Sequence, residues 1–544
     1  MGKWIICSAW PYINAIPHLG TFIHLLTADV YSRFLKLMGE EVISVSGSDE
    51  HGTPIEVEAI KQNISPKELT DRNHKIMLEL LDVYGIELSN YTRTESKVHI
   101  EFVQEFYKKL EENGYIYTKK STQLYCNFCK RFLPDRFVEG ICPYCGYQNA
   151  RGDQCDKCGR LLEPTMLKNP YCVICKNRPI KKETTHWYFD LPAFKDVIKK
   201  YIENNKQLPE NARNFSLQWL KEGLKERAVT RDNKWGIPAP FRGAENKTIY
   251  VWMEAVLGYL SAVKELGIKV GDETLFDRFW KDPRTKTVFF IGKDNIPFHT
   301  IVFPALLLAS GDNYVLPWQV SSTEFILFEG MKFSKSRGIG VWMDEAKNIA
   351  DPEYWRFVLM AIRPEVKDSN FTWKEFKQII NNDLNDVLGN FVHRSLSFTY
   401  KYMKGIVPKP NDIDLDDNNF AKTVMDLREK YVNCMYNFRI REATRLVIET
   451  ARRGNEYLSK KRPWEALSSK NVSTVIYNVI QTSAHLALML YPFMPKASTT
   501  ILSILNLRDL YQKPRFIRKW EIVKPGTKIE KPFPVFRKIN LQRT

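Results

Sequence analysis

The sequence predicts an α/β protein in which a parallel sheet is interrupted by a cysteine-rich insertion and followed by a helical bundle. Three observations lead to this prediction. An apolar segment at residues 3–10 runs through a short loop into a helical pattern. Eight of the ten cysteines fall between positions 126 and 175, in four Cys-x-x-Cys pairs. Beyond about residue 380, apolar residues recur at helical spacing.

The first segment, KWIICSAW, is apolar and rich in residues that favour strands, so we expect a buried strand that ends at Pro11. The residues after Pro17 begin a helix. Backbone N–H groups and the helix dipole at such a start favour phosphate. His18 and Thr21 share one face of the first turn, and Gly20 allows a ligand to approach the backbone. Taken alone, this pattern fits a capped core helix equally well.

The cysteine spacing predicts structural zinc. Each Cys-x-x-Cys turn offers two thiolates, tetrahedral zinc takes four, and a site with four cysteines leaves no open position for catalysis. A disulfide framework fits poorly, because the chain shows no signal peptide and the cysteines cluster in one stretch. We expect nested pairing, with the inner four cysteines at one ion and the outer four at another, and sequential pairing stays open. The expected ligands are Cys126, Cys129, Cys142, Cys145, Cys155, Cys158, Cys172 and Cys175. Cys7 and Cys434 lie in apolar surroundings and are expected in the core.

A second cationic string, KFSKS, places Lys332 and Lys335 three residues apart among small hydroxyl residues. Such a segment can close over a triphosphate and stabilise the charge on departing pyrophosphate. A solvated basic loop is the alternative for this string alone.

The last third of the chain predicts a helix bundle. Two apolar faces support it, at residues 440–451 and 472–486, and Pro492 ends the second. Asn390 and Arg394 stand at i and i+4 on one helix face, and Trp464 follows a basic run. Stacking and hydrogen bonding of this kind suit single-stranded RNA. Core packing for Trp464 and a surface charge for Arg394 are the simpler alternatives.

Length and charge are consistent with this picture. The 544 residues are enough for three or four domains, and 44% hydrophobic residues support large cores. Lys and Arg number 80 against 63 Asp and Glu, a net charge of +17 that suits a polyanionic partner such as RNA. No apolar run reaches the roughly 18–20 residues of a membrane helix, so we expect a cytoplasmic protein without a membrane partner.

Together, the strings around His18 and Lys335 resemble the HIGH and KMSKS signatures of class I aminoacyl-tRNA synthetases. Further segments resemble the methionyl-tRNA synthetase family, of the archaeal type with two zinc knuckles; they lie at residues 47–59, 250–259, 289–311 and 461–467. The resemblance implies a Rossmann-like parallel sheet, an inserted connective domain with one or two structural zinc ions, and an α-helical anticodon-binding bundle. It also implies activation of methionine by ATP with magnesium, release of pyrophosphate, and transfer of methionine to tRNA(Met), including initiator tRNA.

The resemblance carries roles onto individual residues. The catalytic positions are His18, Thr21, Lys332 and Lys335. Those implied to contact ATP are His18, Gly20, Thr21, Gly292, Asp294, Lys332 and Lys335, with Lys293 in the same loop. Those implied to bind methionine are Trp10, Tyr12, Asp49, Trp252, Ala255, Tyr259 and His299, with Asp49 holding the ammonium group. Asn390, Arg394 and Trp464 match the anticodon contacts.

Three positions depart from the family pattern. Thr21 replaces the last histidine of HIGH, Phe333 replaces the methionine of KMSKS, and Val256 stands where many relatives have proline. We expect these changes to tune rates and pocket shape without removing activity, and Phe333 to act as an anchor facing the core.

The expected organisation has six parts: residues 1–115 and 236–320 for the two halves of the catalytic domain, 116–235 for the connective insertion, 321–380 for the KMSKS-type loop and linking region, 381–525 for the anticodon-binding domain, and 526–544 for a tail. Many relatives carry a further dimerising domain after this point, so we expect a monomer.

Three other functions fit the sequence less well. A catalytically inactive tRNA-binding paralogue would lack His18, Asp49 or Lys335, and all three are present. Synthetases for leucine, isoleucine and valine carry a much larger editing insertion, and the cysteine enzyme uses zinc in its substrate pocket. A zinc-ribbon nucleic-acid binder has no use for the two phosphate-binding signatures.

Overall fold

A five-stranded parallel sheet forms the centre of the catalytic half of the structure, a computed structural model that describes residues 2–152, 155, 157, 158, 160, 162–333, 338–465, 469 and 471–541. The strand order is β14-β13-β1-β2-β3. These strands are β1 (Lys3–Ser8), β2 (Glu41–Ser48), β3 (Asn90–Arg93), β13 (Thr285–Gly292) and β14 (Gln319–Thr323). All neighbouring pairs are parallel, so the predicted strand at the N-terminus is confirmed as the middle of the sheet.

Alternate residues of β1 face opposite sides of this sheet, as the two-residue period of a strand requires. Trp4 and Ile6 belong to the core shared with α1 (Leu19–Leu37). Ile5 and Cys7 belong to a second core, with α4 (Lys97–Glu112), α8 (Gly258–Val270) and α10 (Phe303–Ser310). Both faces are thus covered, which explains why the strand sequence is apolar throughout instead of alternating.

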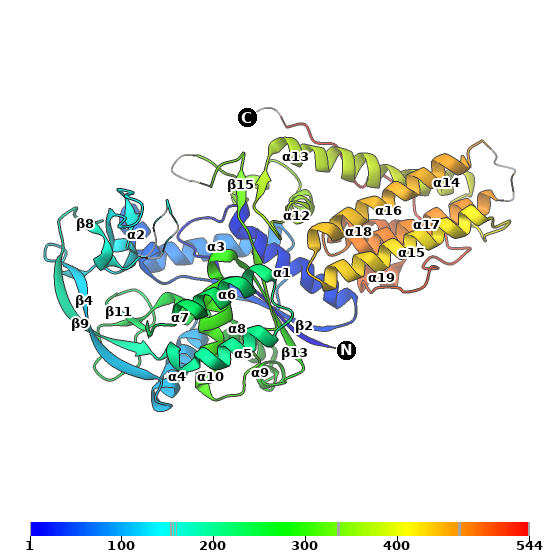
Figure 1. The fold of residues 1–544 in the computed structure, drawn as a ribbon. Helices are drawn as coiled ribbons and strands as arrows, with labels where there is room; N and C mark the ends of the chain where they lie inside the picture. Colours follow the sequence, from blue (N-terminus) through cyan, green and yellow to red (C-terminus); the bar gives the residue numbers. More distant parts are fainter. Residues whose placement is uncertain are drawn as a thin grey trace.

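The insertion leaves the sheet after α4 and returns before β13. Its backbone is a long antiparallel ribbon of β4 (Ile116–Cys126) and β9 (Ile180–Phe189), in a four-stranded sheet of order β10-β9-β4-β5. A smaller sheet of order β7-β6-β8 carries the middle cysteines. Figure 1 shows this ribbon at one end of the molecule and the helical bundle at the other. The insertion therefore extends the sheet domain away from the bundle.

The bundle is built from α14 (Asn390–Tyr402), α15 (Leu415–Tyr436), α16 (Ile440–Lys461), α17 (Val472–Leu490) and α18 (Pro495–Ile504). The predicted apolar face of α16 is buried, and every residue of α17 that the sequence placed on its apolar face is buried too. Gly454 allows α16 to approach α14 closely, since a Cβ there would lie 2.3 Å from the ring of Phe391. This contact sets the spacing of the two helices beside Asn390.

None of the described helices combines the length and the apolarity that crossing a bilayer requires.

Two helices, α12 (Pro352–Ala361) and α13 (Trp373–Gln378), join the two ends of the molecule. Helix α13 continues through a π-helical stretch, η7 (Ile379–Gly389), directly into α14. The sequence pattern did not predict the π-helical stretch. On α12, the Arg356 guanidinium is 1% exposed and lies 2.7 Å from the Asp29 carboxylate of α1 and 2.9 Å from the Phe493 carbonyl of the bundle. This buried arginine links the catalytic sheet to the bundle.

The last described residues return to the same joint. Asn381 Nδ2 donates to the Ile539 carbonyl at 3.0 Å, and the Arg537 amide donates to the Tyr354 hydroxyl at 2.8 Å. Figure 1 shows this end of the chain beside α13. The C-terminal segment is therefore packed onto the protein.

Candidate functional site

A wide cleft of about 2350 Å³ opens at the carboxyl ends of the parallel strands. Its walls come from the β1–α1 loop, from the end of β13 and β14, and from the inserted ribbon. Ligands of open α/β sheets bind at this edge, because the strand-to-helix loops converge there. The volume exceeds the 300–1,000 Å³ or so of a typical small-molecule pocket, so the cleft has room for more than one ligand.

His18 caps α1 at the floor of this cleft. Its Nδ1 accepts a hydrogen bond from the Gly20 amide at 3.1 Å, which leaves the proton of the neutral ring on Nε2. Burial lowers the pKa of His18 to about 4, so the ring is neutral at physiological pH. Thr21 Oγ1 lies 3.5 Å from Nε2. Together they present neutral donors, with the helix start, at a position suited to phosphate.

The ring of Phe333 stacks on His18, with ring centroids 4.3 Å apart and planes 8° from parallel. Phe333 also packs against the sheet core, so the predicted anchor is confirmed. Gly340 makes room for it, because a Cβ at Gly340 would lie 2.6 Å from the Phe333 ring. The start of the KFSKS string is therefore fixed to the residue that caps α1.

Of the remaining residues of the predicted ATP site, some line the cleft and others do not. Gly292 and Asp294 line the cleft, as does the exposed Lys332. Lys293 does not line it; its ammonium pairs with Glu324 at 2.6 Å and Asp368 at 3.2 Å. Lys335 lies outside the described residues.

An aromatic group forms the wall next to the β1–α1 loop. Tyr12 meets Trp252 edge-on at 5.9 Å, and Trp252 stacks on Phe298 at 5.0 Å. Trp10 is held between two glycines, since a Cβ at Gly47 or at Gly258 would each lie 2.6 Å from its ring. Trp10, Tyr12 and Trp252 line the cleft. The other predicted methionine-binding residues, Asp49, Ala255, Tyr259 and His299, do not line it.

Tyr259 and His299 form a buried pair. His299 Nδ1 lies 2.9 Å from the Asn295 carbonyl and must donate to it, so Nε2 accepts from the Tyr259 hydroxyl at 2.8 Å. Burial lowers the pKa of His299 to about 4, in agreement with a neutral ring. The pair is thus a neutral, aromatic group that is buried outside the lining of the cleft.

Asp49 follows β2 and is 2% exposed, and its Oδ1 has no hydrogen-bond partner among the described residues. Burial raises the pKa of Asp49 well above its usual value, and the nearby Glu254 raises it further. A buried carboxylate without a countercharge is costly, and a bound cation relieves that cost. The site is therefore suited to an ammonium group.

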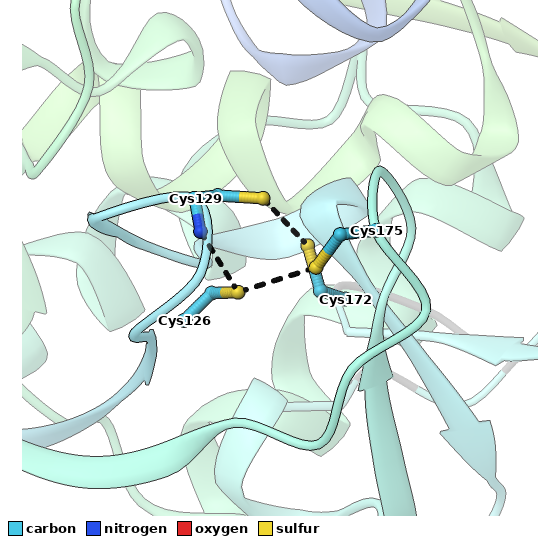
Figure 2. Close-up of side chains that lie close together, drawn as sticks. All are labelled: Cys126, Cys129, Cys172 and Cys175. Carbon is cyan, nitrogen blue, oxygen red and sulfur yellow. Dashed lines mark hydrogen bonds between the residues drawn. The ribbon is translucent and has the colours of Figure 1, made fainter.

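The eight cysteines of the insertion form two groups, and all eight are free. Cys126 Sγ lies 3.4 Å from Cys175 Sγ, and Cys129 Sγ lies 3.8 Å from Cys172 Sγ (Figure 2). The inner group joins Cys142 with Cys158 at 3.9 Å and Cys145 with Cys155 at 3.6 Å. Within each group the sulfur atoms lie within 4.8 Å of one another. The nested pairing is therefore confirmed as the arrangement of the thiols.

These distances fit the expected metal. Four thiolates about 2.3 Å from a tetrahedral zinc lie roughly 3.8 Å apart, whereas a disulfide requires about 2.05 Å. Cys7 and Cys434 are buried outside both groups, as predicted. Four sulfur ligands leave no position for a substrate, so each group is suited to structural zinc.

Two of the predicted anticodon residues, Arg394 and Trp464, are in contact in the bundle. Asn390 and Arg394 lie in α14, and the Arg394 guanidinium lies 5.2 Å from the centre of the Trp464 ring. Trp464 is 41% exposed. It follows Arg462, the residue that caps the end of α16 in the left-handed conformation, with φ 42°. Lys461 of the preceding basic run pairs with the buried Asp417 at 2.8 Å. An exposed aromatic ring with an arginine over it is a surface that can stack on a base.

Some residues of the site were not singled out from the sequence. Arg231 lines the cleft, and its guanidinium lies 3.7 Å from the centre of the Tyr250 ring. His51 is buried between two carboxylates, of Glu254 and Glu95. His51 lies in the same segment as Asp49, and Glu254 lies two positions after Trp252. The sequence does not predict that His51 and Glu254 are in contact, because they are 203 positions apart.

Comparison with known proteins agrees with the site. The family model described as class I tRNA synthetases (M) matches residues 4–396, and the one described as the anticodon binding domain of methionyl tRNA ligase matches residues 407–543. The methionine–tRNA ligase of Thermofilum pendens is 52% identical over 99% of this chain and 95% of that protein. The methionine–tRNA ligase of Ignicoccus hospitalis is 50% identical over 99% of this chain and 96% of that protein.

The solved Mycobacterium tuberculosis methionyl-tRNA synthetase bound by methionyl-adenylate has the same fold, with a TM-score of 0.82 at 24% identity over 99% of this chain and all of that one. The match of the family models to both halves, and the identity to the relatives over nearly the whole length, settle the classification. The chain belongs to the methionyl-tRNA ligase family of class I tRNA synthetases.

Proposed function

We propose that this chain is a methionine–tRNA ligase that activates methionine with ATP and transfers it to tRNA(Met). A carboxylate oxygen of methionine attacks the α-phosphorus of ATP, the bond to the β-phosphate breaks, and pyrophosphate leaves. A hydroxyl of the terminal adenosine of tRNA then attacks the carbonyl of methionyl-adenylate and releases AMP. The observation that carries the proposal is the buried carboxyl group of Asp49, whose Oδ1 has no hydrogen-bond partner among the described residues, in a chain of this family.

Methionine recognition divides into charge and shape. Asp49 is proposed to hold the ammonium group, because it is a buried carboxyl group whose Oδ1 has no hydrogen-bond partner among the described residues. The thioether is proposed to pack against Trp10, Trp252 and Tyr259, where sulfur–aromatic contacts add a modest preference. His299 is neutral and bonded to Tyr259, so this end of the pocket offers no charge to a competing polar side chain.

ATP is proposed to lie over the start of α1. The Gly20 backbone leaves space for the nucleotide, while His18 and Thr21 donate to phosphate oxygens. Lys332 and Lys335 are proposed to neutralise the charge that develops on pyrophosphate. Magnesium is expected to arrive with ATP, where it neutralises phosphate charge when bound. No side chain is assigned as a general base, since positioning and charge neutralisation are the main contributions in phosphoryl transfer.

Asn390, Arg394 and Trp464 are proposed to read the anticodon, and the two cysteine groups are proposed to hold structural zinc. The cluster of Arg394 and Trp464 supports the first assignment, and the sulfur geometry supports the second. A catalytically inactive paralogue is the alternative, and no observation favours it: the chain keeps both His18 and Asp49.

Methionine-dependent ATP–pyrophosphate exchange tests the proposal. With the purified, zinc-loaded protein and each of the twenty amino acids in turn, we expect exchange with methionine alone. Exchange with a different amino acid would overturn the pocket assignment and keep the adenylation chemistry. No exchange with any amino acid, with tRNA binding intact, would support the inactive paralogue.

The Trp464→Ala variant tests the anticodon surface. We expect its kcat/KM for charging tRNA(Met) to fall roughly 5- to 150-fold, because stacking of one base is worth about 1–3 kcal/mol. Methionine-dependent exchange should stay unchanged, since Trp464 does not line the cleft and follows α16 of the helical bundle, which Figure 1 shows at the end of the molecule opposite the insertion. The control is Tyr402→Ala, which removes an aromatic ring of similar exposure from the same bundle, 42% against 41%. Equal losses in both variants would show that Trp464 has no special role.

A further inference from the structure

His51 occupies an unusual position for a buried histidine. The side chain is 1% exposed, and both ring nitrogens face carboxylates: Nδ1 lies 2.7 Å from Glu254 Oε1, and Nε2 lies 2.5 Å from Glu95 Oε1. An ionised carboxylate only accepts hydrogen bonds, so both nitrogens must donate. With both carboxyl groups ionised, the geometry places a doubly protonated imidazolium between them.

The charges around His51 agree with that state. Burial favours the neutral ring, but Glu254 and Glu95 raise the pKa of His51 to about 10. The pKa of each of the other buried histidines next to the pocket, His99 and His299, is instead lowered by burial. The neighbouring carboxylate of Glu50 is taken by Arg93 at 2.7 Å, and the Trp235 ring covers His51 at 5.7 Å. His51 is thus a fixed cation, shielded from water.

The ion pair joins the two halves of the amino-acid pocket. His51 lies two residues after Asp49, on the segment that follows β2. Glu254 lies in α7 (Val251–Ala255), between Trp252 and Ala255. The 2.7 Å contact therefore ties the residue that takes the ammonium group to the helix that supplies the aromatic wall. Glu95, just after β3, fixes the other side of the ring to the next strand of the sheet.

The same pair also sets the charge beside Asp49. Glu254 is 0% exposed and lies close enough to disfavour an ionised Asp49, whereas His51 has the opposite effect. Without the His51 cation, two carboxylates would stand near the ammonium site with nothing to balance Glu254. Glu254 would then hold a proton or draw the ammonium group away from Asp49.

We propose that His51, clamped between Glu254 and Glu95, is a positioning residue for methionine: it holds α7 against the Asp49 segment and neutralises Glu254, so that the ammonium group is directed to Asp49 alone. The inference rests on the proposed function, because it assigns the ammonium of methionine to Asp49. ATP is expected to bind independently of His51, Glu254 and Glu95, since none of these three residues lines the cleft.

The test uses the full, zinc-loaded protein in ATP–pyrophosphate exchange, with active sites counted by single-turnover adenylate formation. The variants are His51→Gln, Glu254→Gln and the double variant. His74→Gln is the control, a histidine near the same strand that is hydrogen-bonded to Ser48 at 2.8 Å and not to Glu254. For His51→Gln we expect the KM for methionine to rise by about tenfold or more, with the KM for ATP within about twofold of its original value. The double variant should be no worse than either single one, because the two groups act as a unit.

Other outcomes are decisive. If the wild-type protein shows no methionine-dependent exchange, the proposed function is refuted, and this result does not depend on the variants. With an active wild type, unchanged methionine KM in both single variants would overturn the role of His51. Equal rises in the KM for methionine and for ATP, or effects that simply add in the double variant, would mean a general structural role. If neither single variant folds, the pair serves stability and the inference fails.

Discussion

Asp49→Asn should lower methionine-dependent exchange by roughly 10²- to 10³-fold while making the ligand-free protein more stable. The loss follows from removing the only charge proposed to meet the ammonium group, because breaking a buried charge pair costs about 3–5 kcal/mol. The gain follows from removing a buried carboxylate with an unpartnered oxygen. Leaving a buried polar group unsatisfied costs about 1–3 kcal/mol, so we expect a gain on the order of 1 kcal/mol.

The pH dependence of this gain has a definite sign. The pKa of Asp49 is higher in the folded protein than in the unfolded chain. Its destabilising effect is therefore absent below the unfolded value of about 3.9, grows as pH rises toward the folded pKa, and stays in full above it. Denaturant unfolding should show the largest difference between variant and wild type at neutral pH, and a shrinking one toward pH 4.

Asp29→Asn is the matched control. Asp29 is also a buried aspartate of the catalytic domain, but it pairs with Arg33 at 2.9 Å and Arg356 at 2.7 Å. Its removal leaves two buried guanidinium groups with fewer partners, so we expect a loss of about 3–5 kcal/mol instead of a gain. If Asp49→Asn also destabilised the protein at neutral pH, the carboxylate would have a structural partner and the ammonium assignment would be wrong.

Loss of metal from the outer cysteine group should unfold the insertion. Zinc bound by four thiolates contributes roughly 10–16 kcal/mol in small zinc-binding peptides, and this group ties the start of the insertion, at Cys126, to its far side, at Cys172. We expect about two zinc ions per chain by elemental analysis. The Cys126→Ser variant should keep about one, lose methionine activation, and be cleaved within residues 116–235 by a protease that leaves the wild type intact.

The two groups should differ in how readily they lose metal. Each group has two buried cysteines, but the other two are exposed in the inner group (Cys145 and Cys158) and only half-buried in the outer group (Cys129 and Cys175). Titration with a mercurial reagent in the presence of a zinc indicator should therefore release the inner zinc first. Cys434→Ala, which removes a core thiol outside both groups, should change neither phase. A single phase of release, or no zinc in the purified protein, would contradict the assignment.

Much of the site could be predicted from the sequence because its signals are local. The strand that became β1, the helix that His18 caps, and the shared helix of Asn390 and Arg394 depend on residues a few positions apart. The four Cys-x-x-Cys turns likewise identify the thiols by spacing alone. The resemblance to a known family then named the remaining positions, including Asp49 at the end of β2.

Other features depend on residues that are distant along the chain. Sequence spacing allowed either pairing of the cysteines, and only the packing of β4, β6 and β8 brings Cys126 to Cys175 and Cys142 to Cys158. The sequence also did not predict that Phe333 stacks on His18 or that Arg394 lies over Trp464, because each contact joins residues that are far apart along the chain. The π-helical stretch before Asn390 arises inside a segment whose apolar spacing is that of an ordinary helix.

The sequence by itself determined the family of this protein and the residues proposed to carry its chemistry, since a residue's type and its spacing from near neighbours set the local structure and the available ligands. Only the tertiary structure decided their environment. Asp49 is a buried carboxyl group with a raised pKa, His299 is neutral, and His51 is a cation held by Glu254 across 203 positions. Burial and the charges that fold beside a group control its ionisation, and both come from contacts between distant parts of the chain.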